Sequence, residues 1–432
     1  MNQHCQDVTV DLRKALFGIA KALDNVGFES KNHGQRVGYI AYRCALSVGW
    51  EEEQAQLAFS LGLIHDCGVS QIDEHLSLTS GFVPDSSYHH CQKGYQILKE
   101  CPVLSIFAKP VLYHHTPWVE LKAMPISELE KELAAIVMLA DRVDYLYGIT
   151  SSDRYGNLTP DGKAIIIERL TEQANEMFET NLVQHMCELV DLDDFWFSME
   201  IPYIENMRDN FEPVPFFSQK MSLNETVAFA EFIANVVDTK SSFTFRHSLK
   251  VGQLSEYLAK QLGYSHTTQR KLYLAGLVHD IGKLQTPNEI LHKYDLLTDE
   301  EYCCIKRHAT DTRFALQELF SSPQICQWAS NHHERLDGSG YPMGKTAEQL
   351  DQPSRIIAVV DVFQALTQSR PYRQGMTLEE SLNMLADLVE NHKLDREVFE
   401  CLKKHSEYCF ELSTDKRMYA FSVSEYLWGV MP

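Results

Sequence analysis

The sequence predicts an all-α protein built from two helical domains in tandem. Apolar residues recur at spacings of three and four over many segments, and few alternating strand patterns appear. A widely spaced pattern of histidines and aspartates also occurs twice. At 432 residues the chain exceeds the usual size of one hydrophobic core, and a prior of about two or three domains follows. We expect domains at 1–200 and 222–432, joined by a linker at 201–221.

The helical periodicity assigns the individual elements in chain order. We expect helices at 51–64, 133–146, 163–190, 225–237, 248–262 and 378–389. The third of these is expected to run unbroken to Val190 and to finish the first domain, as 378–405 helps to finish the second. Prolines and mixed charges between Ile201 and Pro215 favour a linker there.

Composition excludes several classes of protein. The net charge of -21 lacks the basic footprint of nucleic-acid binding, so we expect no DNA or RNA partner. No apolar stretch approaches the roughly 18 residues of a membrane helix, and the N-terminus lacks a signal-like segment. Eleven cysteines without a CxxC pair suit reduced thiols. We therefore expect a cytoplasmic protein without a membrane partner.

The repeated pattern consists of metal-ligand residue types. The step from His33 to His65 and from His247 to His279 is 32 residues, and the step from the middle histidine to the His-His pair is 24 in both halves. Imidazoles and carboxylates without cysteine suit Fe, Mn or Zn rather than a thiolate structural zinc. The second set is His247, His279, Asp280, His308, His332, His333 and Asp361, and the first is His33, His65, Asp66, His90, His114, His115 and Asp141.

A lone histidine seldom supports a metal site, because only about one in ten would be a ligand. Seven residues of the kinds that bind metals recur twice in the same order, which favours a metal site in each half. The His279-Asp280 pair follows an apolar run that ends at Val278 and precedes Gly282, which predicts that the pair lies at the end of a helix. Two adjacent residues can reach one centre only at such an end.

Longer motifs in the second half resemble a known family. Residues 279–283 read HDIGK and residues 332–342 read HHERLDGSGYP. They are similar to the signatures of HD-GYP cyclic dinucleotide phosphodiesterases, a branch of the HD metallohydrolase superfamily. The resemblance covers about 222–432, and residues 369–373, SRPYR, match a further family element. The first half resembles the wider HD superfamily, since its HDCGV segment lacks the lysine and its HHTPW segment lacks the GYP loop.

The resemblance implies a centre of two divalent cations, Fe or Mn, in the second domain. One cation would be held by His247, His279, Asp280 and Asp361, and the other by Asp280, His308, His332 and His333. It also implies that Asp280 bridges the ions and that Lys283 contacts the scissile phosphate. Substrate contacts are further implied for Gly340, Tyr341, Arg370 and Arg373. Some members bind a third metal through a glutamate four residues before the first histidine; Phe243 stands there, whereas the first domain has Glu29.

The implied activity is hydrolysis of a cyclic dinucleotide, 3',3'-cGAMP and/or c-di-GMP, to a linear 5'-phosphorylated dinucleotide. Two interpretations of the first domain remain open. It is a second metal-bearing phosphohydrolase that removes the terminal phosphate, or it is a sensory or dimerisation module. The sequence leaves open the base preference, the metal and whether the chain forms a homodimer.

Overall fold

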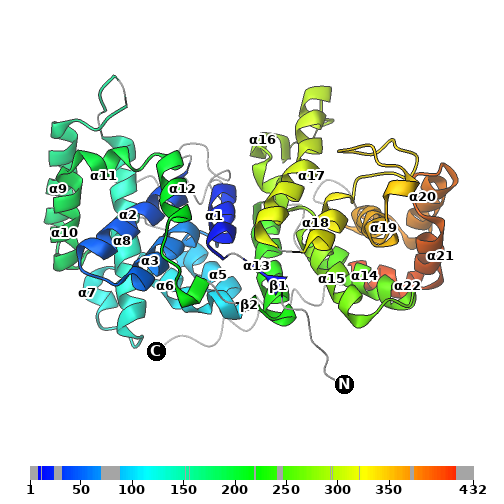
Figure 1. Ribbon diagram of the computed structural model, residues 1–432, viewed down its shortest axis with the longest axis horizontal. Helices are drawn as coiled ribbons and strands as arrows, with labels where there is room; N and C mark the ends of the chain where they lie inside the picture. Colours follow the sequence, from blue (N-terminus) through cyan, green and yellow to red (C-terminus); the bar gives the residue numbers. More distant parts are fainter. Residues whose placement is uncertain are drawn as a thin grey trace. The chain divides into compact units, whose positions relative to one another are not determined.

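The computed structural model describes residues 8–10, 12–23, 32–69, 88–150, 152–154, 156–217, 220–240, 247–291, 293, 295–320, 322–369 and 374–414. Helices dominate these ranges (Figure 1). Their strands are the two-residue β1 (Val8–Thr9) and β2 (Lys220–Met221), which pair antiparallel with Val8 opposite Met221. The expected all-α fold is confirmed.

The helices divide into two compact units. The first unit comprises the described residues within 1–242, with 284–288 and 317–321. Its helices are α1 (Leu12–Leu23), α2 (His33–Ser47), α3 (Glu52–Ile64), α5 (Tyr88–Lys99), η2 (Pro102–Phe107), α6 (Ala108–Tyr113), α7 (Trp118–Leu121), α8 (Glu128–Ile149), α9 (Pro160–Glu172), α10 (Thr180–Asp191), α11 (Asp193–Phe197), α12 (Ile201–Asp209), η3 (Pro215–Phe217) and α13 (Leu223–Lys240).

The second unit comprises most of the chain from residue 243 onward. Its helical elements are α14 (His247–Gln261), α15 (His266–Val278), η4 (Ile281–Gln285), α16 (Asn288–Leu291), α17 (Asp299–Leu319), α18 (Pro323–Ser330), η5 (Ala347–Gln349), α19 (Gln352–Thr367), α20 (Leu378–Glu390), α21 (Arg396–Lys404) and α22 (Ser406–Thr414), with the parts of η4, α16 and α17 at 284–288 and 317–321 grouped with the first unit. Within this unit α14 packs against α15 and α19, and α15 packs against α18.

Each unit contains a closely packed helix pair of the same dimensions. The helices α2 and α14 each have 15 residues, and α3 and α15 each have 13. At both crossings two glycines meet. A Cβ on Gly62 would lie 2.6 Å from the Cα of Gly38, and one on Gly276 would lie 2.7 Å from the Cα of Gly252. Only glycine permits this approach, which brings the end of the second helix beside the start of the first.

Local capping explains where several helices begin. Ser127 and Glu130 form a reciprocal capping box at the start of α8. The Asp351 carboxylate accepts a hydrogen bond from the Ser354 amide at 3.1 Å at the start of α19. These two helices carry the last aspartate of each ligand set, Asp141 and Asp361, and both aspartates are buried.

The prediction of one helix from 163 to 190 is wrong. The segment forms α9 and α10, with a break at 173–179. Asn175 adopts φ 68°, a left-handed conformation that ends helical hydrogen bonding and that asparagine tolerates. The Glu179 carboxylate then accepts a hydrogen bond from the Leu182 amide at 2.7 Å and starts α10. Apolar spacing continues across this break, so periodicity alone does not locate it.

Part of the expected linker is helical. Residues 201–209 form α12, which buries Ile204 and packs against α2. The backbone carbonyl of Glu212 then accepts a hydrogen bond from the Gln56 side chain at 2.9 Å. The boundaries at 200 and 222 stay a prediction. Within the described ranges, no helix combines the length and apolar content needed to cross a lipid bilayer.

Two candidate metal centres

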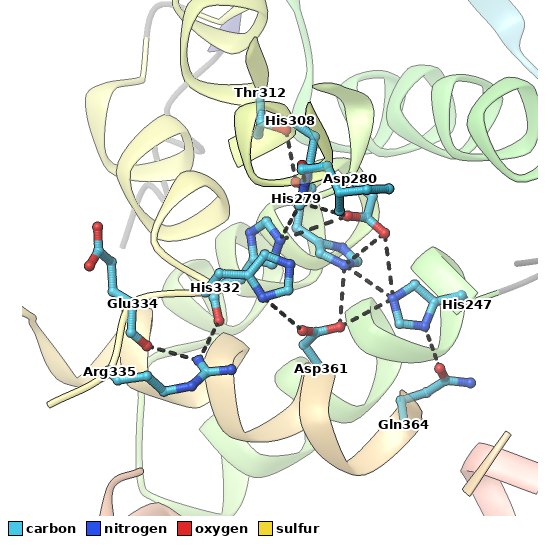
Figure 2. Close-up of polar contacts among 12 residues, drawn as sticks. His247, His279, Asp280, His308, Thr312, His332, Glu334, Arg335, Asp361 and Gln364 are labelled. Atoms are coloured by element: carbon cyan, nitrogen blue, oxygen red, sulfur yellow. Dashed lines mark hydrogen bonds and ion pairs between the residues drawn. The ribbon is translucent and has the colours of Figure 1, made fainter. Parts of the chain in front are cut away.

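The predicted ligands of the second unit come from the ends and interiors of five separate segments. His247 begins α14, His279 caps the end of α15, and Asp280 follows it, as the helix-end prediction requires. The other four come from α17 (His308), the turn after α18 (His332 and His333) and α19 (Asp361). The fold brings all seven side chains together, and Figure 2 labels each of them except His333.

The first group of ligand atoms surrounds one oxygen of Asp280. The Nε2 atoms of His247 and His279 lie 3.2 Å apart. Asp280 Oδ2 lies 3.7 Å from His247 Nε2 and 3.4 Å from His279 Nε2. Asp361 Oδ1 lies 3.3 Å from His247 Nε2. Four ligand atoms therefore face one point.

The second group surrounds the other oxygen of Asp280. The Nε2 atoms of His308 and His332 lie 3.2 Å apart, and Asp280 Oδ1 lies 3.5 Å and 3.7 Å from them. His333 joins these two histidines and lies 3.8 Å from Asp361 Oδ2. The two oxygens of Asp280 thus face different histidine groups, which is the geometry of a bridging carboxylate.

Hydrogen bonds orient the imidazoles. His279, His308 and His332 each donate from Nδ1 to the carbonyl three residues earlier, at 2.7, 2.5 and 2.6 Å. The Nδ1 atom of His247 contacts Oε1 of Gln364 (Figure 2). A protonated Nδ1 leaves Nε2 with its lone pair, and Nε2 is the atom that points into the groups.

Electrostatics favours the protonation states that metal ligands need at His308, His332 and Asp280. Burial lowers the pKa of His279, but Asp280 and Asp361 outweigh burial and raise that pKa. Burial lowers the pKa of His308 to about 4 and holds the pKa of His332 well below its usual range. Burial opposes ionisation of Asp280, but His279 and then Lys283 outweigh it and hold the pKa of that carboxyl well below its usual range. Neutral imidazoles and ionised carboxylates are the ligand forms.

The 334–345 loop is fixed beside the centre by a buried carboxylate. Glu334 is 1% exposed and accepts hydrogen bonds from the amides of Met343 and Lys345, both at 2.8 Å. A Cβ on Gly340 would lie 2.3 Å from the Arg335 amide nitrogen, so the loop needs glycine there. The Tyr341 ring lies 4.7 Å from the ring of His333. Gly340 and Tyr341 are therefore beside the ligands.

Lys283 lies at the same centre. Its ammonium contacts Asp280 Oδ2 at 2.5 Å, and its side chain is 21% exposed. It therefore lies between a buried candidate ligand and solvent. Arg370 and Arg373, for which substrate contacts were expected, lie outside the described residues, as do Phe243 and Glu29.

The first unit repeats the arrangement with its own residues. The Nε2 atoms of His33 and His65 lie 3.3 Å apart, and those of His90 and His114 lie 3.5 Å apart. Asp66 directs Oδ2 to His65 at 3.5 Å and Oδ1 to His90 at 3.5 Å. Its two oxygens face separate groups, as those of Asp280 do.

The other two predicted ligand residues of the first unit also lie at this centre. Asp141 Oδ1 lies 3.4 Å from His33 Nε2. His115 Nδ1 lies 4.0 Å from Asp141 Oδ2, and the ring of His115 lies 4.1 Å from that of His114. All seven predicted residues of the first set therefore converge.

The surroundings of the two centres differ. His33 Nδ1 contacts the Asp144 carboxylate at 2.7 Å, and Arg36 also contacts that carboxylate. An amide, Gln364, stands in the same place in the second unit. Arg142 contacts Asp141 Oδ2 at 2.6 Å.

Two further positions beside the first centre differ in chemistry. Buried Val69 takes the position of Lys283. Cys91 lies beside His90 and His114; burial raises the pKa of its thiol, but His114 and His90 outweigh burial and lower that pKa to about 6.

Both centres suit divalent cations. Among the described residues, neither Asp280 Oδ1 nor Asp66 Oδ1 has a hydrogen-bond partner, although both atoms are buried. Buried polar atoms normally have partners. A cation beside each oxygen would supply one, and the imidazole and carboxylate atoms around it are ordinary ligands for such ions.

Comparison with known proteins assigns the family. An HD domain family matches residues 31–146, and a second HD domain family matches residues 231–398. The chain is 50% identical over 404 residues to the 3'3'-cGAMP-specific phosphodiesterase 1 of Vibrio cholerae serotype O1. The aligned region covers 94% of each chain. The chain belongs to the HD-GYP family of cyclic dinucleotide phosphodiesterases.

One further relative matches a smaller part of the chain, and one solved structure matches most of it. A cyclic di-GMP phosphodiesterase of Pseudomonas aeruginosa is 38% identical over 167 residues, 38% of this chain and 40% of the relative. A crystal structure of a cyclic GMP-AMP specific phosphodiesterase of V. cholerae has a TM-score of 0.59 at 20% identity and covers 92% of this chain and 97% of that chain. That likeness shows that the tandem fold is shared.

Several residues around the HD-GYP centre and its partner in the first unit were not predicted. Gln364 and Asp144 each contact a ligand histidine of another helix, and Arg36 contacts Asp144. The sequence holds one signal for the first two, because each lies three residues after the last aspartate of its set. The motif that contains Glu334 was predicted, but not the role of Glu334 in holding the loop. No sequence pattern marks Cys91, which the helix α5 places beside the centre.

Proposed function

We propose that this chain hydrolyses a cyclic dinucleotide at the second unit. The observation that carries the proposal is the bridging position of Asp280, whose two oxygens face two separate histidine groups. Such an arrangement suits a pair of divalent ions; nitrogen and oxygen ligands suit Fe, Mn or Zn, and the family resemblance favours Fe or Mn. Once bound, two divalent ions would generate a nucleophile from water and stabilise charge on the phosphate.

The residues of the chain supply the remaining requirements. Hydrogen bonds to backbone carbonyls fix the imidazoles of His279, His308 and His332, so this part of the ligand geometry exists before substrate arrives. Lys283 would offset negative charge that develops on the scissile phosphate. Tyr341 and the backbone at Gly340 would close one side of the site, because Glu334 holds their loop in place. Arg370 and Arg373 would contact the phosphates.

We expect 3',3'-cGAMP to be the preferred substrate. The full-length relative named for that substrate matches both units, whereas the cyclic di-GMP relative matches only about two fifths of the chain. Residues that contact the bases are expected outside the short HD-GYP motifs, so a relative that matches the whole chain is the better guide to base preference. The product would be the linear dinucleotide with a 5'-phosphate. We place this reaction in the cytoplasm, where the eleven cysteines would stay reduced.

Product analysis tests this proposal. The purified chain would be loaded with Mn²⁺ or Fe²⁺ and incubated with 3',3'-cGAMP, c-di-GMP and c-di-AMP, and the products would be separated by chromatography. We expect 3',3'-cGAMP to be converted fastest to a linear dinucleotide. Faster hydrolysis of c-di-GMP would contradict the base preference alone, and no hydrolysis of any ring would contradict the function.

For the first unit we propose phosphomonoester hydrolysis, the removal of the 5'-phosphate from that linear product. The supporting observation is that its seven predicted ligand residues converge. The two oxygens of Asp66 face separate histidine groups, as those of the bridging aspartate in the second unit do. Its site has no GYP loop, which suits a terminal phosphate rather than a ring. Arg142 beside Asp141 adds positive charge. The alternative role in sensing or dimerisation predicts no free phosphate.

A further inference from the structure

The centre of the first unit contains a side chain that the second unit lacks. Cys91 follows His90 on α5, and Ala309 follows His308 on α17. Both Cys91 and Ala309 are buried. Because alanine fills this position in the second unit, the fold itself requires only a small side chain. The sulfur is therefore a specific feature of the first centre.

The position of the sulfur fits a shared metal ion. Cys91 Sγ lies 3.5 Å from His90 Nε2. His114 donates from Nδ1 to the Val111 carbonyl at 2.6 Å, so its Nε2, 3.5 Å from His90 Nε2, would be its ligand atom. A tetrahedral ion with bonds of about 2.3 Å to sulfur and about 2.0 Å to nitrogen holds a sulfur and a nitrogen ligand atom about 3.5 Å apart. The donor atoms of Cys91, His90, His114 and His115 all lie within 4.8 Å of one another.

Unpartnered buried atoms point independently to a ligand at this place. The side chain of His115 is 5% exposed, and neither of its ring nitrogens has a hydrogen-bond partner among the described residues. Asp66 Oδ1, 3.5 Å from His90 Nε2, also has none. Buried polar atoms are rarely left in this state, and one cation would satisfy several of them.

Burial alone does not direct a thiol into the centre. Cys67 follows Asp66 in the same way that Cys91 follows His90, and it is fully buried. Its sulfur packs toward Gly94, and Cys67 is not among the groups of converging donor atoms in the described part of the chain. Cys91 therefore differs from a cysteine that merely fills the core beside a ligand.

We propose that Cys91 is a thiolate ligand of the first centre, where it joins His90, His114 and His115 in holding a zinc-class ion. Thiolate ligands favour zinc, whereas the nitrogen and oxygen ligands of the second centre suit Mn or Fe. Binding would release the thiol proton to solvent, so one Zn–S bond forms as one S–H bond breaks. The two units would then hold different metals. This inference is independent of the activity proposed for either unit.

Cobalt substitution tests the proposal in the full-length chain. The second centre would be disabled by His279→Ala/Asp280→Ala, and Co²⁺ would be added as a spectroscopic substitute for zinc. We expect the near-ultraviolet charge-transfer band of a cobalt–thiolate bond. Cys91→Ala should abolish this band and raise the zinc Kd at least about tenfold. The matched variant Cys67→Ala should keep the band.

A second measurement leaves every cysteine in place and so does not depend on how a variant folds. X-ray absorption of the same zinc-loaded chain should show a sulfur neighbour at about 2.3 Å. Zinc surrounded only by nitrogen and oxygen would overturn the proposal. So would a band that persists in Cys91→Ala, bound cobalt without the band, or a parent chain that binds neither metal.

Discussion

Asp280 and Asp66 occupy the same place in two centres, and each divides its two oxygens between two histidine groups. This division is what distinguishes a bridging carboxylate from one that ligates a single ion. Both residues follow a histidine at the end of a buried helix, where two adjacent side chains reach the same centre. The two residues are therefore expected to be the least replaceable in their units.

Lys283 provides a test at the residue scale, because its ammonium contacts Asp280 without belonging to either ligand group. Lys283→Ala should retain the metal and lower kcat by about 10² to 10³, the range for loss of a preorganised electrostatic donor. Metal analysis and steady-state kinetics measure the two effects. Lys271→Ala, which removes an ammonium bound to Gln324 on the same unit, is the control. Loss of metal together with activity would show a structural role instead.

The ligand residues were predictable, and their orienting partners were not. Histidine and aspartate at repeated spacings leave a signal in the sequence because the two sets support each other. Gln364 and Asp144 orient ligand histidines through contacts that form only when α19 packs on α14 and α8 packs on α2. Each lies three residues after the last aspartate of its set, but this spacing does not show which histidine of another helix it contacts.

At the scale of elements, the 334–345 loop depends on one buried carboxylate. Glu334→Gln replaces one accepting oxygen with a donor that faces a backbone amide. The change should cost about 1 to 3 kcal/mol of loop stabilisation, so kcat/KM should fall by roughly one to two orders of magnitude. Metal content should be unchanged, since Glu334 contacts amides. Exposed Glu348→Gln on η5 is the control, and an unchanged kcat/KM for Glu334→Gln would rule out this role.

The crossing of α2 and α3 gives a second test at this scale. A Cβ on Gly62 would lie 2.6 Å from the Cα of Gly38, so Gly62→Ala must push the helices apart. We expect the free energy of unfolding to fall by about 1 to 3 kcal/mol. Gly148→Ala in α8, where a Cβ meets nothing within 4 Å, should be neutral or stabilising. Denaturant unfolding followed by circular dichroism compares them, and equal stabilities would contradict the close-packing explanation.

Apolar periodicity predicted the helices that it was applied to, except that one expected helix is two. The segment 163–190 keeps helical spacing across a break at which Asn175 turns the chain and Glu179 caps α10. Both features are backbone events that use common residue types. A pattern of apolar positions reports which face is buried, and it carries little information on whether the backbone between two such positions remains helical.

At the scale of the whole molecule, the chain carries the same centre twice in different surroundings. The second unit has Lys283 and the glycine loop, while the first has Val69, Arg142 and Cys91. The repeat was visible in the sequence because ligand spacing was retained. The missing lysine and GYP loop of the first half were visible as well, but the places of Arg142 and Cys91 beside the first centre were not, because they depend on how the helices pack.

The most direct test of the central claim is a chromatographic time course on 3',3'-cGAMP with two double variants of the full-length chain. Inorganic phosphate would be followed in parallel. The claim is that the second unit opens the ring, so His279→Ala/Asp280→Ala should leave the cyclic dinucleotide intact. His65→Ala/Asp66→Ala should still consume it and should accumulate the linear 5'-phosphorylated dinucleotide without free phosphate. Ring opening that continues at the wild-type rate in His279→Ala/Asp280→Ala would contradict the claim.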